Sequence, residues 1–255
     1  MTDAKEAAAL ANRFCELAER SLRVGRFFFT DFLGLAEQDI LHAIETKFPH
    51  GTVVSLSGGA EGCERQAARF GDPEQIGYDE PFPIAILKIE PKNQKFADAL
   101  THRDFLGALM NLGVAREKLG DIVIRENCGY LFCAETIAPF LAEELRRVKR
   151  TDVLCAQADA VPPGELFCTK RVTVQAVSER IDALVAKVFS LSREEALGLF
   201  RRGLVFRNGR EAKNNSALPS EGDVISVRGY GRMIYRGCAS LSKKGKKNLL
   251  LDLYV

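Results

Sequence analysis

The stretch formed by residues 178–209 constrains the fold more than any other part of this chain. Ser178 can cap a first short helix and Ser192 a second, because a serine oxygen accepts a hydrogen bond from the free N–H groups of a helix's first turn. Apolar residues recur at helical spacing behind each serine, and Gly203 is a typical helix stop. A strand is predicted next, leading into a tight Asn208-Gly209 hairpin turn. The sequence therefore predicts two short helices followed by a hairpin.

Basic side chains gather on this predicted unit and in the residues just after it. Such a cluster is an electrostatic footprint for phosphates, and the start of the second helix adds N–H donors for one phosphate. A solvated charged face is the alternative interpretation. Asp182 is expected to orient Arg180 and to cap the first helix. The main phosphate contacts are assigned to Arg180, Ser192, Arg193, Arg201 and Arg202, and an extension of the same surface to Arg207, Asn208, Lys213, Arg228 and Arg232.

An ordered series of short motifs resembles the RNA-binding domain named after the fourth small-subunit ribosomal protein, also called the αL motif. The matches extend over about 60 residues, which makes the pattern specific. The resemblance implies binding to structured RNA, with the second helix and the following loop against the backbone. The matching residues are Arg180-Ile181-Asp182, Ser192-Arg193 with Ala196, Gly203-Leu204-Val205, Asn208-Gly209 and Gly222-Asp223.

The composition limits the class of protein. The 255 residues are 46% hydrophobic, enough for more than one domain, and the net charge is only +2, so the basic character is local to the region after Lys170. No run of about 18 apolar residues predicts a membrane span. The first residues have no signal-peptide core, so a cytoplasmic protein is expected.

The cysteines and histidines do not suggest a metal centre. No two of the seven cysteines have the spacing of a zinc or redox motif, and there are three histidines. Most of the cysteines lie in apolar runs, which is typical of buried free thiols in a reducing compartment. No metal and no cofactor are therefore expected.

Residues 1–78 are predicted to form a small α/β domain. Helices are expected over residues 7–22 and 35–48, and a short strand over residues 52–56. A glycine turn at residues 57–62 then leads into an expected third helix. Arg65 and Arg69 would lie one turn apart on that helix, as possible secondary RNA contacts. The turn could cradle a phosphate, but its glycine spacing fits no nucleotide fingerprint and favours a plain turn.

Residues 79–160 are predicted to form a ferredoxin-like β-α-β-β-α-β domain. The expected strands cover residues 83–89, 122–125, 130–134 and 153–156, and the expected helices residues 102–112 and 137–148. Tyr130 and Phe132 share one face of the third strand. They could stack on bases, as aromatics do in RNA-recognition sheets, or pack beneath helices or against another domain.

The remainder of the chain completes an α+β organisation. Residues 158–164, with Pro162-Pro163, are predicted to be a protease-sensitive linker. The αL-type domain is placed at residues 168–240, and residues 241–255 are expected to be a C-terminal tail.

Residues 100–113, together with Lys118-Leu119-Gly120-Asp121-Ile122, resemble the middle domain of the bacterial YlmH family. Proteins of that family place this domain before an αL domain. The resemblance implies a cytoplasmic protein that associates with the large ribosomal subunit and with peptidyl-tRNA on stalled, split subunits. It also implies a role in ribosome-associated quality control, in which alanine tails extend the nascent chain. Older naming of the family implies a link to cell division.

Three functional classes follow from these patterns. The first is a non-enzymatic RNA-binding protein of the translation apparatus that binds rRNA or tRNA and is a monomer away from the ribosome. The second is an RNA-modifying enzyme, since αL domains are also appended to pseudouridine synthases and methyltransferases; no convincing catalytic stretch supports it. The third is a module that only bridges proteins. His102-Arg103-Asp104 spells a kinase fragment, but the other kinase motifs do not accompany it. The first class is favoured.

Overall fold

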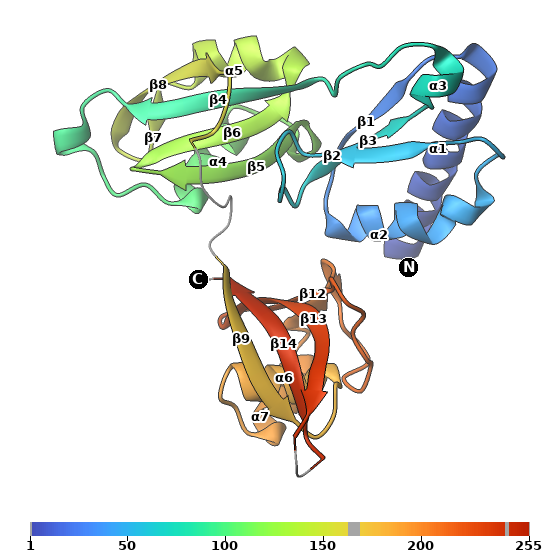
Figure 1. Cartoon of the computed structure of the whole chain (residues 1–255). Helices are drawn as coiled ribbons and strands as arrows, with labels where there is room; N and C mark the ends of the chain where they lie inside the picture. The colour runs from blue at the N-terminus through green and yellow to red at the C-terminus, as the bar shows by residue number, and fades with distance from the viewer. Residues whose placement is uncertain (1, 163–168, 243–244, 255) are drawn as a thin grey trace. The chain divides into compact units, whose positions relative to one another are not determined.

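The computed structural model describes residues 2–162, 169–242 and 245–254 (Figure 1). The chain divides into two compact units, Met1–Leu166 and Phe167–Val255. Pro163 and Gly164 of the expected linker lie outside the described residues, as does Cys168. The architecture is mixed α+β and contains three antiparallel sheets. Among the described residues, no helix has both the length and the apolar character needed to cross a bilayer.

The N-terminal unit begins with a three-stranded sheet in the order β1-β3-β2, against which α1 and α2 pack. Phe14 of α1, Leu41 of α2 and Phe70 of β3 are fully buried between them. The elements are α1 (Thr2–Val24), β1 (Phe28–Leu33), α2 (Leu35–Ile44), η1 (Glu45–Lys47), β2 (Val54–Ser57), β3 (Gln66–Phe70) and α3 (Pro73–Ile76).

The prediction of a third helix after the glycine turn is wrong. Residues 66–70 form β3, the central strand of this sheet, which pairs with both β1 and β2. Ala67 and Ala68 would suit a helix by intrinsic preference, but both are buried in the sheet, where tertiary packing decides. The glycine turn therefore closes a β2–β3 connection and does not begin a helix that could bind phosphate. A Cβ on Gly59 would lie only 2.7 Å from Phe132, so the turn is packed against the chain itself.

A five-stranded sheet follows in the same unit, in the order β5-β6-β4-β8-β7, with every pairing antiparallel. Leaving out the short β7, the order of strands is that of the predicted β-α-β-β-α-β unit. The elements are β4 (Ile84–Pro91), η2 (Gln94–Phe96), α4 (His102–Asn111), η3 (Arg116–Lys118), β5 (Leu119–Arg125), β6 (Cys128–Ala134), η4 (Glu135–Ile137), α5 (Ala138–Glu144), β7 (Arg147–Val148) and β8 (Thr151–Ala158).

The second helix of this sheet is shorter than expected. A helix was predicted over residues 137–148, but α5 ends at Glu144, and Leu145 is already extended. Val148 is fully buried as part of β7, which turns back into β8 through a two-residue connection. Leu145 therefore lies in the extended connection after α5 and Val148 in the β7–β8 hairpin, although the spacing of these two residues also fits a helix.

Both faces of the five-stranded sheet are covered. On one face Leu87 and Leu131 pack against Phe105 of α4 and Leu141 of α5. On the opposite face the side chains of Phe132, Tyr130 and Val123 form a cluster with Phe32 and Cys63 of the N-terminal segment. The alternation of side chains along each strand assigns neighbouring residues to opposite faces.

Most of the described thiols are buried, as expected from their apolar surroundings. Burial raises the pKa of Cys63 and of Cys133 to about 12, and that of Cys155 to about 11, so these groups stay protonated and unreactive. Cys15 is half-buried, whereas Cys238 is exposed. The expectation therefore does not extend to Cys238, which lies in an exposed part of β13.

The C-terminal unit is a six-stranded antiparallel sheet in the order β11-β10-β12-β13-β14-β9, with two helices packed against it. Its core includes Ile181 and Leu184 of α6, Leu199 of α7 and Ile225 of β12. The elements are β9 (Thr169–Ala176), α6 (Ile181–Val188), α7 (Arg193–Arg201), β10 (Val205–Arg207), β11 (Arg210–Glu211), β12 (Val224–Val227), β13 (Gly231–Leu241) and β14 (Lys247–Tyr254).

The C-terminal tail expected at residues 241–255 is instead mostly β14, an interior strand of this sheet. It pairs with β13 on one side and β9 on the other. Leu249 and Leu251 are fully buried in the core. The run of leucines alternates with polar residues only at its end, so the pattern of a half-buried strand is weak. The segment becomes a strand because it pairs with β9, which lies far away in the sequence.

Asp252 connects three strands of this sheet. Its buried carboxylate on β14 accepts hydrogen bonds from Arg171 of β9 at 2.8 and 3.0 Å and from Arg236 of β13 at 2.7 Å. These interactions, that of Arg171 being the largest, lower the pKa of Asp252 from its usual 3.8 to about 2. The folded state therefore favours the charged form.

We predict that Asp252→Asn destabilises the C-terminal unit at pH 7 by about 1–2 kcal/mol. A depression of nearly two pKa units would correspond to more, but Arg171 is 65% exposed and its attraction is screened by solvent. Because the folded pKa is depressed, this contribution is present above pH 4 and is lost as the pH falls toward 2. Urea unfolding at several pH values measures it. A deficit that stays constant down to pH 2 would show that the lost charge is not the cause.

Candidate nucleic-acid interface

The N-terminus of α6 is built around a buried ion pair between Arg180 and Asp182. Asp182 is 2% exposed and receives two hydrogen bonds from the Arg180 guanidinium, at 3.0 and 2.6 Å. Asn215 donates a third at 2.8 Å, and its carbonyl accepts the Asp182 N–H. Burial acts to raise the pKa of Asp182, but the hydrogen bonds from Arg180 and Asn215 outweigh it and the pKa is lowered. Asp182 thus fixes the Arg180 fork, as the sequence predicted. The caps expected from Ser178 and Asp182 are wrong, because Arg180 is the N-cap residue of α6 and no side-chain cap hydrogen bond is found there among the described residues.

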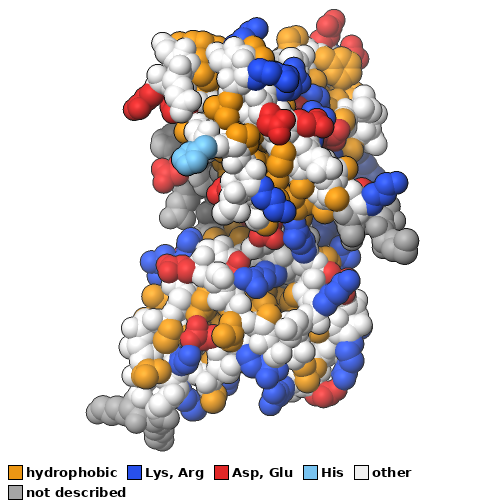
Figure 2. All heavy atoms as spheres, turned by 90° about the vertical axis from the view of Figure 1, so that its right-hand side faces the viewer, with side chains coloured by type: hydrophobic (Ala, Val, Ile, Leu, Met, Phe, Trp, Pro, Cys, Tyr) orange, Lys and Arg blue, Asp and Glu red, His pale blue; other side chains and the backbone are white. Residues whose placement is uncertain are grey.

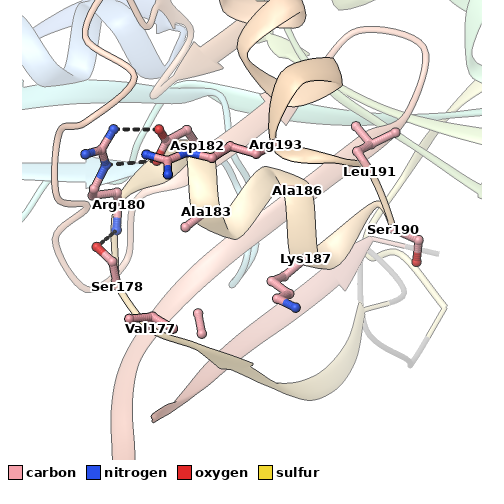
Figure 3. Close-up of a pocket in the computed structure, with 11 residues that line it drawn as sticks. Val177, Ser178, Arg180, Asp182, Ala183, Ala186, Lys187, Ser190, Leu191 and Arg193 are labelled. Atoms are coloured by element: carbon pink, nitrogen blue, oxygen red, sulfur yellow. Dashed lines mark hydrogen bonds and ion pairs between the residues drawn. The ribbon is translucent and has the colours of Figure 1, made fainter. Parts of the chain in front are cut away.

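An open groove of about 640 Å³ runs beside this pair, between the end of β9, α6 and the start of α7 (Figure 3). Arg193 extends in Figure 3 from the start of α7 in the direction of Arg180, and Lys187 projects from α6 further along the groove. Arg193 and Lys187 are exposed, and no ion-pair partner is found for either among the described residues. The groove therefore presents two solvated cations and one held in place by a carboxylate.

The start of α7 is closed by a capping box. The Ser192 hydroxyl accepts the Glu195 N–H at 3.2 Å, and the Glu195 carboxylate accepts the Ser192 N–H at 2.7 Å. The cap predicted at Ser192 is confirmed, and it uses two of the N–H groups that had been assigned to a phosphate. The N–H groups of Arg193 and Glu194 are not part of the box.

The two arginines at the end of α7 interact with their own helix. Arg201 forms an ion pair with Glu194, both side chains being well exposed. Arg202 is the C-cap residue, and its Nε donates to the Gly198 carbonyl at 3.3 Å. Gly203 follows with φ of +63°, the left-handed conformation expected of a helix stop.

The hairpin residues Arg207 and Asn208 are held by a second buried carboxylate, Asp223. Asn208 donates to Asp223 at 2.8 Å and accepts the Val224 N–H at 2.9 Å, so both ends of its amide are engaged. Arg207 contacts the same carboxylate at 2.6 Å. Asn208 and Gly209 both have positive φ, as a tight hairpin turn requires. The side chains of Arg207 and Asn208 therefore stabilise the hairpin through contacts within the chain.

The remaining basic candidates differ in their exposure and in their contacts with other side chains. Lys213 is exposed in the loop after β11, and Arg228 is exposed with its guanidinium 4.6 Å from the Phe206 ring. Arg232 is half-buried, donates to Ser226 at 3.2 Å and lies 4.7 Å from the Tyr254 ring. On the face drawn in Figure 2, basic side chains are spread over the C-terminal unit, in the lower part of the view.

The secondary candidates in the N-terminal unit are either buried or half-buried and bound to other groups of the chain. Phe132 is fully buried and Tyr130 is 7% exposed, both within the cluster beneath the N-terminal segment. Of the two predicted roles, the structure shows packing, and base stacking at these positions is wrong because neither ring is accessible. Arg65 donates to the carbonyls of Phe32 and Leu119, and Arg69 is bound to Ser55 and Asp79.

Several residues that shape the interface were missed by sequence reasoning. Asn215 orients Asp182 from a loop, and nothing in its local pattern indicates this role. Asp223 is part of the Gly222-Asp223 match, but its contact with Arg207 was not predicted. Lys187 could have been found, because it lies on the polar side of the first predicted helix. The described residues contain no cluster of His, Cys, Asp or Glu arranged to hold a metal ion.

Comparison with known proteins places these observations in a family. Residues 78–161 match a family model described as "Putative RNA-binding domain in YlmH". The chain is 32% identical over 225 residues to "Ribosome-associated protein quality control protein P2" of Bacillus subtilis (strain 168), which covers 87% of this chain and 85% of that protein. A solved structure, "Cell division protein ylmH from Streptococcus pneumoniae", superimposes with a TM-score of 0.47 and 22% identity over 60% of this chain and 91% of that chain. The extent and identity of the match to the Bacillus subtilis protein show that the chain belongs to the YlmH family.

Proposed function

We propose that this chain is a non-enzymatic RNA-binding protein of the translation apparatus. It would bind structured RNA, either rRNA or tRNA, on the large ribosomal subunit in the cytoplasm and act in ribosome-associated quality control. The name of the Bacillus subtilis relative supports the process, and the groove beside α6 supports the ligand. The N-terminal, central and αL-type parts would act as modules of one RNA-bound protein.

The observation that carries this proposal is the pairing of Arg180 and Arg193 on one groove. Arg180 is fixed by Asp182, so little side-chain entropy is lost when its outward N–H groups meet a phosphate. Arg193 is exposed beside it at the first position of α7, where the positive end of the helix dipole adds to its charge. A fixed and a mobile guanidinium on one groove suit a bridging contact to one phosphate or to two neighbouring phosphates.

The other candidates fall into two groups in this proposal. Arg202, Lys213, Arg228 and Arg232 extend the phosphate-binding surface away from the groove. Arg201, Arg207 and Asn208 contribute mainly through the fold, because their polar groups already have partners on the chain, and Ser192 contributes as a cap. Lys187 joins the contact surface because it lines the groove.

We predict that Arg193→Ala weakens binding to a structured rRNA or tRNA by about 1–3 kcal/mol, the range for a hydrogen bond to a charged group. The slope of log affinity against log salt should flatten by about one unit, since one phosphate contact is lost. Arg193→Lys should recover only part of the loss, because an ammonium cannot make a two-pronged contact. Fluorescence anisotropy over a salt series measures both effects.

The matched control is Arg13→Ala, which removes one exposed arginine from α1 of the other unit. It should leave affinity and slope close to those of the parent. Equal binding by Arg193→Ala and the parent at every salt concentration would rule out this groove as the RNA site.

We predict that Asn208→Ala affects stability more than RNA binding. Alanine would lose both side-chain hydrogen bonds and would have to adopt a φ of +48°, which together cost about 2–4 kcal/mol. Thermal unfolding should show the loss, whereas RNA affinity measured well below the melting temperature should stay near that of the parent. A large loss of affinity with an unchanged melting temperature would instead place Asn208 on the RNA.

We also predict that the protein performs no RNA modification. Mass spectrometry of rRNA and tRNA from cells with and without the protein should show the same set of modified nucleosides. A pseudouridine or methyl group that disappears without the protein, and is restored by the purified protein, would favour the RNA-modifying alternative.

A further inference from the structure

The N-terminal unit carries a second basic groove, remote in sequence from the first. It has a volume of about 520 Å³ and lies between α4 and residues 144–149, which run from the end of α5 into the turn after β7. One wall is a single face of α4, since its residues recur at helical spacing. The residues lining the groove that the argument uses are Arg103, Asp104, Gly107, Arg146, Arg147 and Lys149.

The charges in this groove are predominantly positive and exposed, and Arg147 also forms an ion pair with Asp152 at 3.3 Å. Arg103 comes from α4, whereas Arg146, Arg147 and Lys149 come from the opposite wall, and all four are exposed. Asp104 is drawn into the cap of α4 by hydrogen bonds from Thr101 at 2.9 and 2.8 Å and is 3.9 Å from Lys149. Glu144 is the other acidic residue of the lining. Cations from two walls can therefore approach one polyanion from both sides.

Gly107 gives the groove a floor onto which a ligand backbone can be laid closely. It lies in the middle of α4, where glycine destabilises a helix relative to alanine because its backbone loses more freedom on folding. A Cβ at this position would meet nothing within 4 Å. Internal packing therefore does not require the glycine, and it leaves the helix backbone open on the side that faces the groove.

The hairpin that forms the second wall also departs from local preference. Lys149 has a φ of +57° at the first position of the two-residue turn between β7 and β8. Glycine or asparagine is favoured at such a position, yet the turn consists of Lys149 and Arg150. Positive charge is thus placed at the tip of a tight turn at some conformational cost.

The opposite side of the sheet cannot provide this binding surface. Tyr130 and Phe132, on the face where RNA-recognition sheets stack bases, are buried beneath the N-terminal segment. The helical side is the remaining broad side of the sheet, and the groove between α4 and residues 144–149 lies there.

We infer that this groove is a second RNA-binding site, which takes the phosphodiester backbone of a structured RNA. Guanidinium groups on two walls can each make a two-pronged contact to a phosphate, and contacts to phosphates position a protein on a nucleic acid without reading its bases. The floor at Gly107 admits a sugar-phosphate backbone against the helix. The site makes contact without reading the base sequence. It rests on the proposed function and deepens it, because it names the face and the residues by which the central part would contact RNA, in a different unit from the αL-type groove.

The test uses the full chain and compares the double variant Arg103→Ala/Arg146→Ala with the matched control Lys92→Ala/Lys95→Ala. Both remove two exposed cations from the same unit. The groove variant should bind a structured rRNA at least about fivefold more weakly than the parent and should flatten the salt slope by about two units. The control should bind like the parent.

Gly107→Gln provides a measurement that a merely structural role would not explain. Glutamine favours the helix and its Cβ would meet no neighbour within 4 Å, so the melting temperature should stay equal or rise. RNA binding should nevertheless weaken, because the side chain fills the floor of the groove. Parent-like RNA binding by both Gly107→Gln and the double variant would overturn the inference.

Two further arms separate this site from the αL-type groove and from a protein partner. Repeating the double substitution in an Arg193→Ala chain should give the same fold-loss as in the parent, whether or not Arg193 itself matters. Polyglutamate should compete poorly for the groove. If polyglutamate binding falls in the groove variants while RNA binding does not, the site takes an acidic polypeptide and the RNA assignment is wrong.

Discussion

The N-terminal unit depends on one buried set of charges centred on Arg65 and Asp121. Asp121 on β5 accepts the N–H groups of Glu64 at 2.6 Å and Arg65 at 3.1 Å, just before β3. The Arg65 guanidinium in turn donates to carbonyls of Phe32 and Leu119. Burial lowers the pKa of Arg65 and raises that of Asp121, and each charge is tolerated because it is hydrogen-bonded. Removal of the Asp121 carboxylate would leave the N–H groups of Glu64 and Arg65 without this acceptor, and removal of the Arg65 guanidinium would leave the carbonyls of Phe32 and Leu119 without this donor. These interactions attach the three-stranded sheet to the five-stranded one.

That attachment decides which face of the five-stranded sheet is covered by the N-terminal segment. Because the N-terminal segment covers Tyr130 and Phe132, the central sheet cannot use aromatic stacking on that face. A domain with the strand order of an RNA-recognition sheet thereby uses the corresponding face as an internal surface. Four basic side chains lie instead on the helical side, beside α4: Arg103, Arg146, Arg147 and Lys149. The match of residues 78–161 to the family's domain model is compatible with such a use of the helices.

In the C-terminal unit, three buried carboxylates divide the arginines into two kinds. Asp182, Asp223 and Asp252 each hold at least one arginine by a short hydrogen bond or ion pair. An arginine held in this way is oriented, and its charge is partly neutralised, so a count of basic residues overstates the charge available to phosphates. Arg193 and Lys187 have no such partner among the described residues, and they line the groove. The surface potential therefore depends on which arginines the carboxylates hold, and this is a property of the folded unit.

The sequence alone determined the local features whose signals are contained within a few residues. The cap at Ser192, the stop at Gly203 and the Asn208-Gly209 turn follow from the backbone preferences of those residues, and the structure contains all three. The Arg180–Asp182 pair was also predictable, because the two residues are neighbours at a helix start. Two strands were decided by the tertiary structure alone. The alanines and the arginine of β3 favour a helix by intrinsic preference, but the segment pairs as a strand. The strand β14 forms only because β13 and β9 flank it. The tertiary structure also decided that Tyr130 and Phe132 are buried. Burial and strand pairing depend on partners far away in the chain, and an aromatic side chain has the same pattern whether a base or a neighbouring sheet covers it.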